Sequence, residues 1–260
     1  MLNVSNIIAL LTDFGTRDHY VGVMKGVILS INPHATIVDI SHDVAPQDVT
    51  SAYFLLKNSH RYFPSGTIFV AVVDPEVGTH RAVLCAETDD ALYLAPDNGT
   101  LSFLAKPTRV VQVTNRKYML EPVSNTFHGR DIFAPVAGHL SLGLEADKLG
   151  PAARSFLQLG CKEPEVSSEG VILGEVVSID QFGNLVTNIS ADRLADFPAI
   201  DVKIAKTTIK SLSTAYGHHA KGELIALIGS GGNLEISLVR GSAAKKLKAS
   251  TGDVVRVRHR

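Results

Sequence analysis

The sequence predicts an α/β protein, with an N-terminal doubly wound α/β domain and a smaller C-terminal β-barrel domain. In the first part of the chain, short apolar runs alternate with segments of helical periodicity, which is typical of a parallel sheet wound with helices. In the last part, only short strand-like runs between glycine-containing turns remain, which favours a small barrel or sandwich. We therefore place the domains at residues 1–160 and 170–260, with a linker near Phe156–Gly170, where apolar residues are few.

The first domain is expected to contain three buried strands, because it has three apolar runs bounded by turn residues. They span Ile7–Leu11, Thr36–Ile40 and Thr67–Val73. Apolar residues at helical spacing predict three helices, of which the first has Asp18 as its cap and ends at Asn32-Pro33. The other two span Asp48–Tyr62 and Arg130–Leu142. A hairpin is expected where Asp89-Asp90 separates the runs Ala82–Ala86 and Leu92–Ala95.

The second domain is expected to contain only short strands, each bounded by a turn signal. These predicted strands span Val171–Ile179, Leu185–Ile189, Val202–Ile204, Glu223–Ile228, Leu234–Leu238 and Asp253–Val257.

Composition restricts the classes of function. A net charge of -1 over 260 residues provides no basic field for nucleic acid. No apolar run is long enough to span a bilayer, and no basic segment precedes the first apolar run, as it would in a signal peptide. Cys85 and Cys161 form no CxxC motif, which excludes a structural zinc site built from cysteines and favours a reduced, cytoplasmic setting. The expected partner is a small-molecule substrate, not a nucleic acid or a membrane.

Two carboxylates follow predicted strands at equivalent places. Asp13 ends the first strand and Asp74 ends the third, so in a parallel sheet both lie at the carboxyl edge, where α/β folds bind ligands. Arg81 follows seven residues after Asp74, across a turn that contains Pro75 and Gly78, and can reach back to the same space. An aspartate that caps a turn and forms a surface ion pair with Arg81 explains Asp74 and Arg81 equally well. A turn-forming role also explains Asp13 or Asp74 alone, but it explains less easily why both strands end in an aspartate.

A second candidate segment is Thr126–Pro135, which precedes and begins a predicted helix. Asp131 can cap that helix, and His128 then projects from the loop, where imidazole chemistry is commonly placed. A surface histidine explains His128 by itself at least as well. His128, Asp131 and His139 are acceptable metal ligands, but their spacing matches no zinc motif, so we expect no metal site.

The third candidate segment is Ile179–Ile189, in the second domain. Phe182 offers a flat face for a base, and the amide of Asn184 offers a donor and an acceptor. A turn built on Gly183-Asn184 accounts for the same residues. The loop at Ser230, which leads to Glu235, can approach a ligand through its backbone, and it is also an ordinary hairpin turn.

Together these segments resemble the S-adenosylmethionine hydroxide adenosyltransferase family, in the family's order and over nearly the whole chain. The motifs are TDFG, DHYVGVMKG, YFPSGTIFVAVVDPEVGTHR, PDNGTL, TFHGRDIFAPVA and DQFGNLVTNI. The resemblance implies an α/β domain, a β-barrel, and a homotrimer with sites between subunits. It also implies hydrolysis of S-adenosylmethionine to adenosine and methionine, with no cofactor. The family usually has VVDPGVGT, and here Glu76 replaces that glycine, which costs strain if its φ is positive.

The resemblance also implies roles for single residues. It implies that Asp74, Arg81 and His128 hold the attacking water or hydroxide, and that Asp13 holds the ribose hydroxyls. The residues that it places on the adenine and methionine side are Phe182, Asn184, Ser230 and Glu235.

Three alternative functions stay open. A halide-dependent adenosyltransferase of the same superfamily is the first, although that branch lacks the pair that Arg81 and His128 match. A non-catalytic sensor of adenosine or S-adenosylmethionine is the second. A metal-dependent hydrolase is the third, and chelation tests it.

Overall fold

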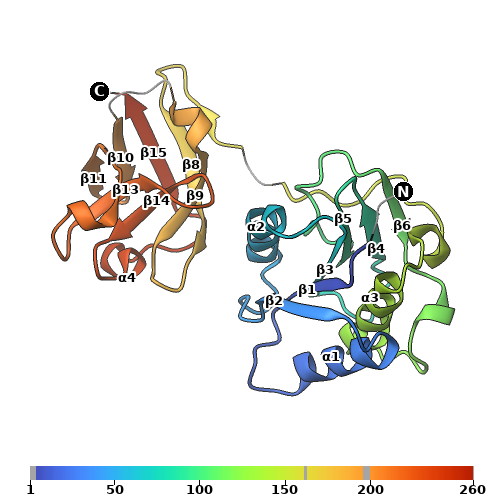
Figure 1. Cartoon of the computed structure of the whole chain (residues 1–260). Coiled ribbons are helices and arrows are strands. Elements are labelled where there is room, and N and C mark those ends of the chain that lie inside the picture. The colour runs from blue at the N-terminus through green and yellow to red at the C-terminus, as the bar shows by residue number, and fades with distance from the viewer. Residues whose placement is uncertain (1–3, 161–162, 196–199, 260) are drawn as a thin grey trace. The chain divides into compact units, whose positions relative to one another are not determined.

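The computed structural model describes residues 4–160, 163–195 and 200–259. The chain divides into two compact units, unit 1 (Met1–Leu159) and unit 2 (Gly160–Arg260). Cys161 and part of the predicted linker lie outside the described residues. The fold class is confirmed, since unit 1 is a mixed α/β sheet domain and unit 2 is a nearly closed β-barrel (Figure 1).

The sheet of unit 1 has the strand order β2-β1-β3-β5-β4-β6. Its strands are β1 (Ile7–Thr12), β2 (Thr36–Ser41), β3 (Thr67–Val72), β4 (Val83–Glu87), β5 (Ala91–Pro96) and β6 (Arg109–Gln112). The first three strands and β5 run parallel, as the alternation of strands and helices predicted. The predicted hairpin is β4–β5, and β6 adds a further antiparallel strand that the sequence analysis missed.

Helices cover both faces of this sheet (Figure 1). They are α1 (Tyr20–Ile31), α2 (Val49–Ser59) and α3 (Ala134–Ser141). Alternate residues of β1 point to opposite faces, so Ile8 and Leu10 pack with α1 and α3. Ala9 and Leu11 pack with α2 on the other face. The strand is therefore buried on both sides, which explains why its sequence is a continuous apolar run.

Two predicted helix starts are wrong. His19, not Asp18, occupies the N-cap position of α1, and no side chain caps that helix. The segment predicted as one helix from Arg130 begins as a π-helical turn, Gly129–Phe133, and becomes α-helical at Ala134. Asp48 does cap α2, since its Oδ1 accepts a hydrogen bond from the Ser51 N–H at 2.9 Å. That helix ends at Ser59, and a short 3₁₀ turn, His60–Tyr62, completes the predicted segment.

Unit 2 has the strand order β11-β10-β15-β8-β9-β14-β13-β12, with β7 paired to β8. Its strands are β7 (Glu165–Val166), β8 (Ile172–Ile179), β9 (Leu185–Ser190), β10 (Ile200–Ile204), β11 (Thr207–Lys210), β12 (Leu212–Ser213), β13 (Leu224–Ile228), β14 (Asn233–Leu238) and β15 (Val254–His259). A short helix, α4 (Ala243–Leu247), follows β14. All six predicted strands are present. Three further strands were not predicted: β7, which lies inside the predicted linker, β11 and β12.

Two further features of the described residues bear on function. No helix in the described ranges is long and apolar enough to cross a membrane. Cys85 lies on β4 with no exposed surface, and burial raises the pKa of its thiol to about 12.

Candidate active site

Asp13 and Asp74 lie on the same edge of the unit 1 sheet. Thr12 pairs with Val72 where the parallel strands β1 and β3 end, so the two carboxylates follow their strands at neighbouring positions. Both line one cavity of about 320 Å³. The predicted shared pocket is therefore present. Its lining residues are Asp13, Phe14, Tyr20, Pro46, Gln47, Val72, Asp74, Val77, Thr126, Phe127, His128 and Gly129.

The turn after β3 fixes the position of Asp74. Its Oδ1 accepts a hydrogen bond from the Glu76 N–H at 3.2 Å, which holds the carboxylate against its own turn. Glu76 does not adopt a positive φ, so replacing the family glycine costs no backbone strain there. The positive φ of the turn falls on Gly78, at 82°. A Cβ on Gly78 would lie 2.2 Å from the carbonyl oxygen of Asn125, so this turn packs directly on the loop that carries His128.

Arg81 and Asp74 form a buried ion pair. Their side chains are only 4% and 5% exposed, and Arg81 Nη2 donates to Asp74 Oδ2. Arg81 Nη1 donates to the carbonyl oxygen of Ala82 at 2.6 Å. Burial raises the pKa of Asp74, and the charge of Arg81 opposes that rise. The surface ion pair considered as an alternative is therefore wrong, since water is largely excluded from these groups.

His128 lies immediately before the π-helical turn and lines the same cavity. It is half-buried and not a surface histidine. Burial lowers its pKa, and the nearby Arg81 lowers the pKa further. The imidazole is therefore neutral at neutral pH and able to accept a proton.

Asp131 holds the His128 loop instead of capping a helix. It is 1% exposed, and its Oδ2 accepts a hydrogen bond from the Ser124 N–H at 2.8 Å. Arg130 donates to both carboxylate oxygens, from Nε at 2.6 Å and from Nη2 at 3.0 Å. Burial by itself would raise the pKa of Asp131, but the hydrogen bonds from Arg130 and Ser124 bring that pKa below its ordinary value. The predicted cap is thus an internal brace of this loop.

Aromatic rings that the sequence analysis did not assign form one wall of the cavity. The ring centroids of Tyr20 and Phe127 are 5.1 Å apart, and that of Phe14 lies 5.9 Å from each. Gly129 allows this packing, because a Cβ there would lie 3.2 Å from both phenylalanine rings. Tyr20 stands at the helical spacing of a core residue, yet it is 40% exposed at the start of α1. An aromatic residue seven positions after the strand-end Asp13 is the signal in the sequence that could have identified it.

In unit 2, Phe182 and Asn184 lie on the predicted turn between β8 and β9. Asp180 organises the turn: its Oδ1 accepts from the N–H groups of Phe182 and Asn184 at 2.9 and 2.8 Å. The side-chain amide of Asn184 donates to Asp180 Oδ2 at 2.8 Å. Phe182 is 77% exposed, whereas Asn184 is buried. A large aromatic ring held in solvent by a rigid turn is available to stack on a planar ligand.

Ser230 and Glu235 lie in and just after the β13–β14 hairpin. Ser230 is exposed at the hairpin turn. Glu235 is buried, and its Oε1 accepts hydrogen bonds from Tyr216 and from the Ser237 hydroxyl, the latter at 2.7 Å. Glu235 therefore has protein partners of its own, and Tyr216 is a neighbour that the sequence analysis missed.

The structure thus brings three predicted residues, Asp13, Asp74 and His128, to one cavity and places Arg81 against Asp74. Two polar atoms of this group, Arg81 Nε and His128 Nδ1, are buried without a hydrogen-bond partner in the described part of the chain. Buried polar atoms are normally paired, so each of these two nitrogens has hydrogen-bonding capacity that no described protein group uses. Across the described ranges, no three side chains of histidine, cysteine, aspartate or glutamate come together as a metal site would require.

Both parts of the chain match one protein family. Residues 8–150 match the SAM hydroxide adenosyltransferase N-terminal domain, and residues 174–256 match the C-terminal domain of the same family. An (R)-S-adenosyl-L-methionine hydrolase from Thermus thermophilus is 35% identical over 95% of this chain and 97% of the relative. One from Methanocaldococcus jannaschii is 34% identical over 98% and 97%.

More distant relatives and solved structures agree with this match. A fluorinase from an Actinoplanes species is 30% identical, but the alignment covers 72% of each chain. The crystal structure of an uncharacterized conserved protein from Thermotoga maritima has a TM-score of 0.90 and 39% identity, over 97% of this chain and all of that one.

Proposed function

Because the chain belongs to the SAM hydroxide adenosyltransferase family, we propose that it hydrolyses S-adenosylmethionine to adenosine and methionine, with water or hydroxide attacking C5′ in line with the C–S bond. Full-length relatives carry the name (R)-S-adenosyl-L-methionine hydrolase, whereas the relatives named fluorinase are more distant. Similarity at this level supports the reaction class for this chain.

The observation that carries the proposal is the buried Arg81–Asp74 ion pair, together with Asp74 and His128 on the wall of one cavity. We assign to these side chains the hydrogen bonds of the attacking water, with neutral His128 as the acceptor and the Arg81 guanidinium as the donor. The Arg81 guanidinium stays protonated and favours a nascent hydroxide. Asp74 keeps the guanidinium in place and balances its charge. These three residues are therefore assigned to the nucleophile.

The proposed reaction balances without an acid or a metal. The water oxygen forms a bond to C5′ while the C5′–S bond breaks, and the electron pair leaves with sulfur as the neutral thioether of methionine. The water loses one proton, which neutral His128 can accept. Since the sulfonium is already a good leaving group, alignment of the nucleophile supplies much of the acceleration.

The remaining residues are assigned to the substrate. Asp13, on the cavity wall, is proposed to bind the ribose hydroxyls. We assign the adenine and methionine side to residues of unit 2, Phe182, Asn184, Ser230 and Glu235. Assembly as a homotrimer in the cytoplasm, with no metal or other cofactor, completes the proposed state of the protein.

Incubation with S-adenosylmethionine in ¹⁸O-water tests the reaction directly. The label is expected in the 5′-hydroxyl of adenosine, with and without a chelator. Labelled homoserine or the formation of methylthioadenosine would contradict displacement at C5′. Added halide tests the alternative of a halide-dependent adenosyltransferase. A 5′-halo-5′-deoxyadenosine product would assign the chain to those enzymes. Binding of adenosine without any turnover would instead identify a sensor.

A further inference from the structure

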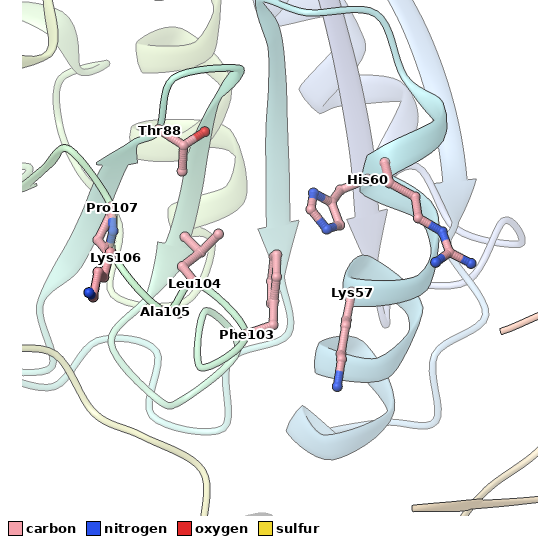
Figure 2. Close-up of a pocket in the computed structure, with 9 residues that line it drawn as sticks. Lys57, His60, Thr88, Phe103, Leu104, Ala105, Lys106 and Pro107 are labelled. Carbon is pink, nitrogen blue, oxygen red and sulfur yellow. The ribbon is translucent and has the colours of Figure 1, made fainter. Parts of the chain in front are cut away.

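A second cavity in unit 1 lies at the opposite edge of the sheet from Asp13 and Asp74. It has a volume of about 360 Å³ and is lined by residues around the end of α2, the β4–β5 turn and the loop before β6 (Figure 2). Thr88 lies where β5 begins, beside the start of β3, so this is the amino edge of the parallel strands. The lining residues are Lys57, His60, Arg61, Thr88, Phe103, Leu104, Ala105, Lys106 and Pro107.

Three cationic side chains of this cavity lack a carboxylate partner. In the described part of the chain, no acidic oxygen lies within 4.0 Å of the charged nitrogens of Lys57, Arg61 or Lys106. Lys57 Nζ instead lies 3.3 Å from the Tyr53 hydroxyl and over the Tyr53 ring. Arg61 similarly lies over the ring of Tyr62, with Cζ 4.9 Å from the centroid. All three side chains are exposed and line one hollow, so an anion there would meet positive charge with no carboxylate on the wall.

The inner surface of the cavity adds a planar wall and a polar atom. The rings of His60 and Phe103 lie 4.9 Å apart, and both side chains border the hollow in Figure 2. His60 Nδ1 lies 2.9 Å from the Tyr93 hydroxyl. Burial raises the pKa of Tyr93 to about 12, so its hydroxyl keeps the proton that it can donate to Nδ1. In that arrangement His60 carries its own proton on Nε2, where it is a further donor.

We propose that this cavity binds a phosphoryl group, with Lys57, Arg61 and Lys106 contacting the phosphate oxygens. Phe103 and His60 provide a face for the planar body of an organic phosphate, and free inorganic phosphate would use the same cations. The proposed hydrolysis needs no phosphate, so this site is independent of that reaction. The β4–β5 turn carries two aspartates, and neither is among the lining residues. Asp89 accepts a hydrogen bond from the Thr108 hydroxyl at 3.1 Å, and the charge of Asp90 contributes to the raised pKa of Tyr93.

Calorimetric titration of the full chain with phenyl phosphate tests the proposal, because this probe has a ring and a phosphate but no nucleoside for the candidate active site. Saturable binding is expected at constant ionic strength. Arg61→Ala and Lys106→Ala should each weaken it by about tenfold, the loss typical of one charge-assisted hydrogen bond. Lys148→Ala is the matched control, since Lys148 is on the same unit but already lies 3.9 Å from Glu145 and 3.8 Å from Asp147.

Two further measurements separate a built site from general attraction of anions. Bound phosphate should raise the pKa of His60 in an NMR titration, since burial, and then Arg61, keep that pKa below its ordinary value in the free protein. Tighter binding of phenyl phosphate than of inorganic phosphate identifies an organic ligand, and equal binding identifies the free ion. Sulfate and chloride as effective as phosphate, or alanine variants that bind like Lys148→Ala, would overturn the proposal.

Discussion

Asp13 Oδ2 accepts a hydrogen bond from the backbone N–H of Gln47, with 2.8 Å between the two atoms. Gln47 adopts a left-handed backbone, with φ at 66°, immediately before the residue that caps α2. The start of α2 therefore holds one oxygen of a carboxylate that follows β1. The other oxygen, Oδ1, has no protein partner among the described residues and is the atom expected to receive the ribose hydroxyls.

Asp13→Ala should weaken the binding of adenosine and of substrate together. The substitution removes the acceptor of the diol, and a lost hydrogen bond to a charged group typically costs about 1.5–3 kcal/mol. Calorimetry with adenosine measures this loss without turnover. Asp13→Asn keeps an acceptor for the Gln47 N–H and serves as the structural control. Equal adenosine affinity of the wild type and Asp13→Ala would mean that Asp13 does not bind the ribose.

Arg81→Ala should lower kcat by about 10²–10³-fold, as expected when one preorganised donor to a developing oxyanion is removed. Adenosine affinity should change little, because adenosine has no nascent hydroxide to stabilise. Arg81→Lys keeps the charge without the planar fork and should recover only part of the rate. Single-turnover rates beside adenosine calorimetry separate the two effects.

A thermal unfolding scan must accompany Arg81→Ala, because this variant leaves the buried carboxylate of Asp74 unpaired. If Arg81→Ala unfolds at the working temperature, Arg81→Lys carries the test. Loss of adenosine binding in a folded Arg81 variant, with normal binding in Asp13→Ala, would mean that the two roles are assigned the wrong way round.

The rate should fall on the acid side as His128 becomes protonated. Its folded pKa is lowered from 6.5, so the neutral, proton-accepting form persists at neutral pH and is lost only as pH falls through that lowered pKa. A single-turnover pH profile measures this decline, and an NMR titration of His128 should give the same midpoint. His128→Asn should be slow at every pH and lose that acid limb. A limb that survives unchanged in His128→Asn would assign the titration to another group, and Asp74 is the next candidate.

Gly78→Ala should destabilise the protein by more than about 1 kcal/mol and reduce turnover. A methyl group at this positive φ would meet the carbonyl oxygen of Asn125 and separate the Asp74 turn from the His128 loop. Gly143→Ala is the matched control, since Gly143 has φ at 89° but no heavy atom within 4 Å of an added Cβ. The free energy of unfolding in denaturant and kcat are measured on both variants. The comparison distinguishes the clash with Asn125 from the strain of a side chain at a positive φ. Equal effects of the two substitutions would mean that the close approach to Asn125 is unimportant.

Light scattering at micromolar concentration should give about three times the chain mass of 27.8 kDa. A closed ring of three chains is expected, because the proposed subunit contacts are heterologous. A fully active monomer would contradict the proposed assembly.

Much of the fold follows from local patterns, because a strand buried on both faces, such as Ile7–Thr12, must be apolar throughout. That Asp13 and Asp74 lie at the same edge of the sheet followed from the direction of their parallel strands alone. What local pattern does not contain is the state of a side chain in three dimensions. The local sequence around Arg81 and Asp74 is the same whether their ion pair is exposed or buried. Packing around the turn decides between the two.

The mistaken caps have a similar origin. Asp131 stands where an N-cap is expected, but the π-helical turn directs its carboxylate inward to Ser124 and Arg130. Such a turn depends on tertiary packing, here on Gly129 against the aromatic wall. Strands β11 and β12 were missed for a simpler reason: they are short, and β11 has only one buried residue, Ile209, so apolar periodicity is barely present.

The burial of Cys85 has a practical consequence for anyone who studies this chain in solution. A thiol with no exposed surface and a raised pKa reacts with alkylating reagents only when the β4 region opens to solvent. In a variant with Cys161 replaced by serine, the alkylation rate of Cys85 therefore reports how often the unit 1 sheet opens. Ligands that stabilise the folded protein slow this alkylation, so they can be ranked without an assay of turnover.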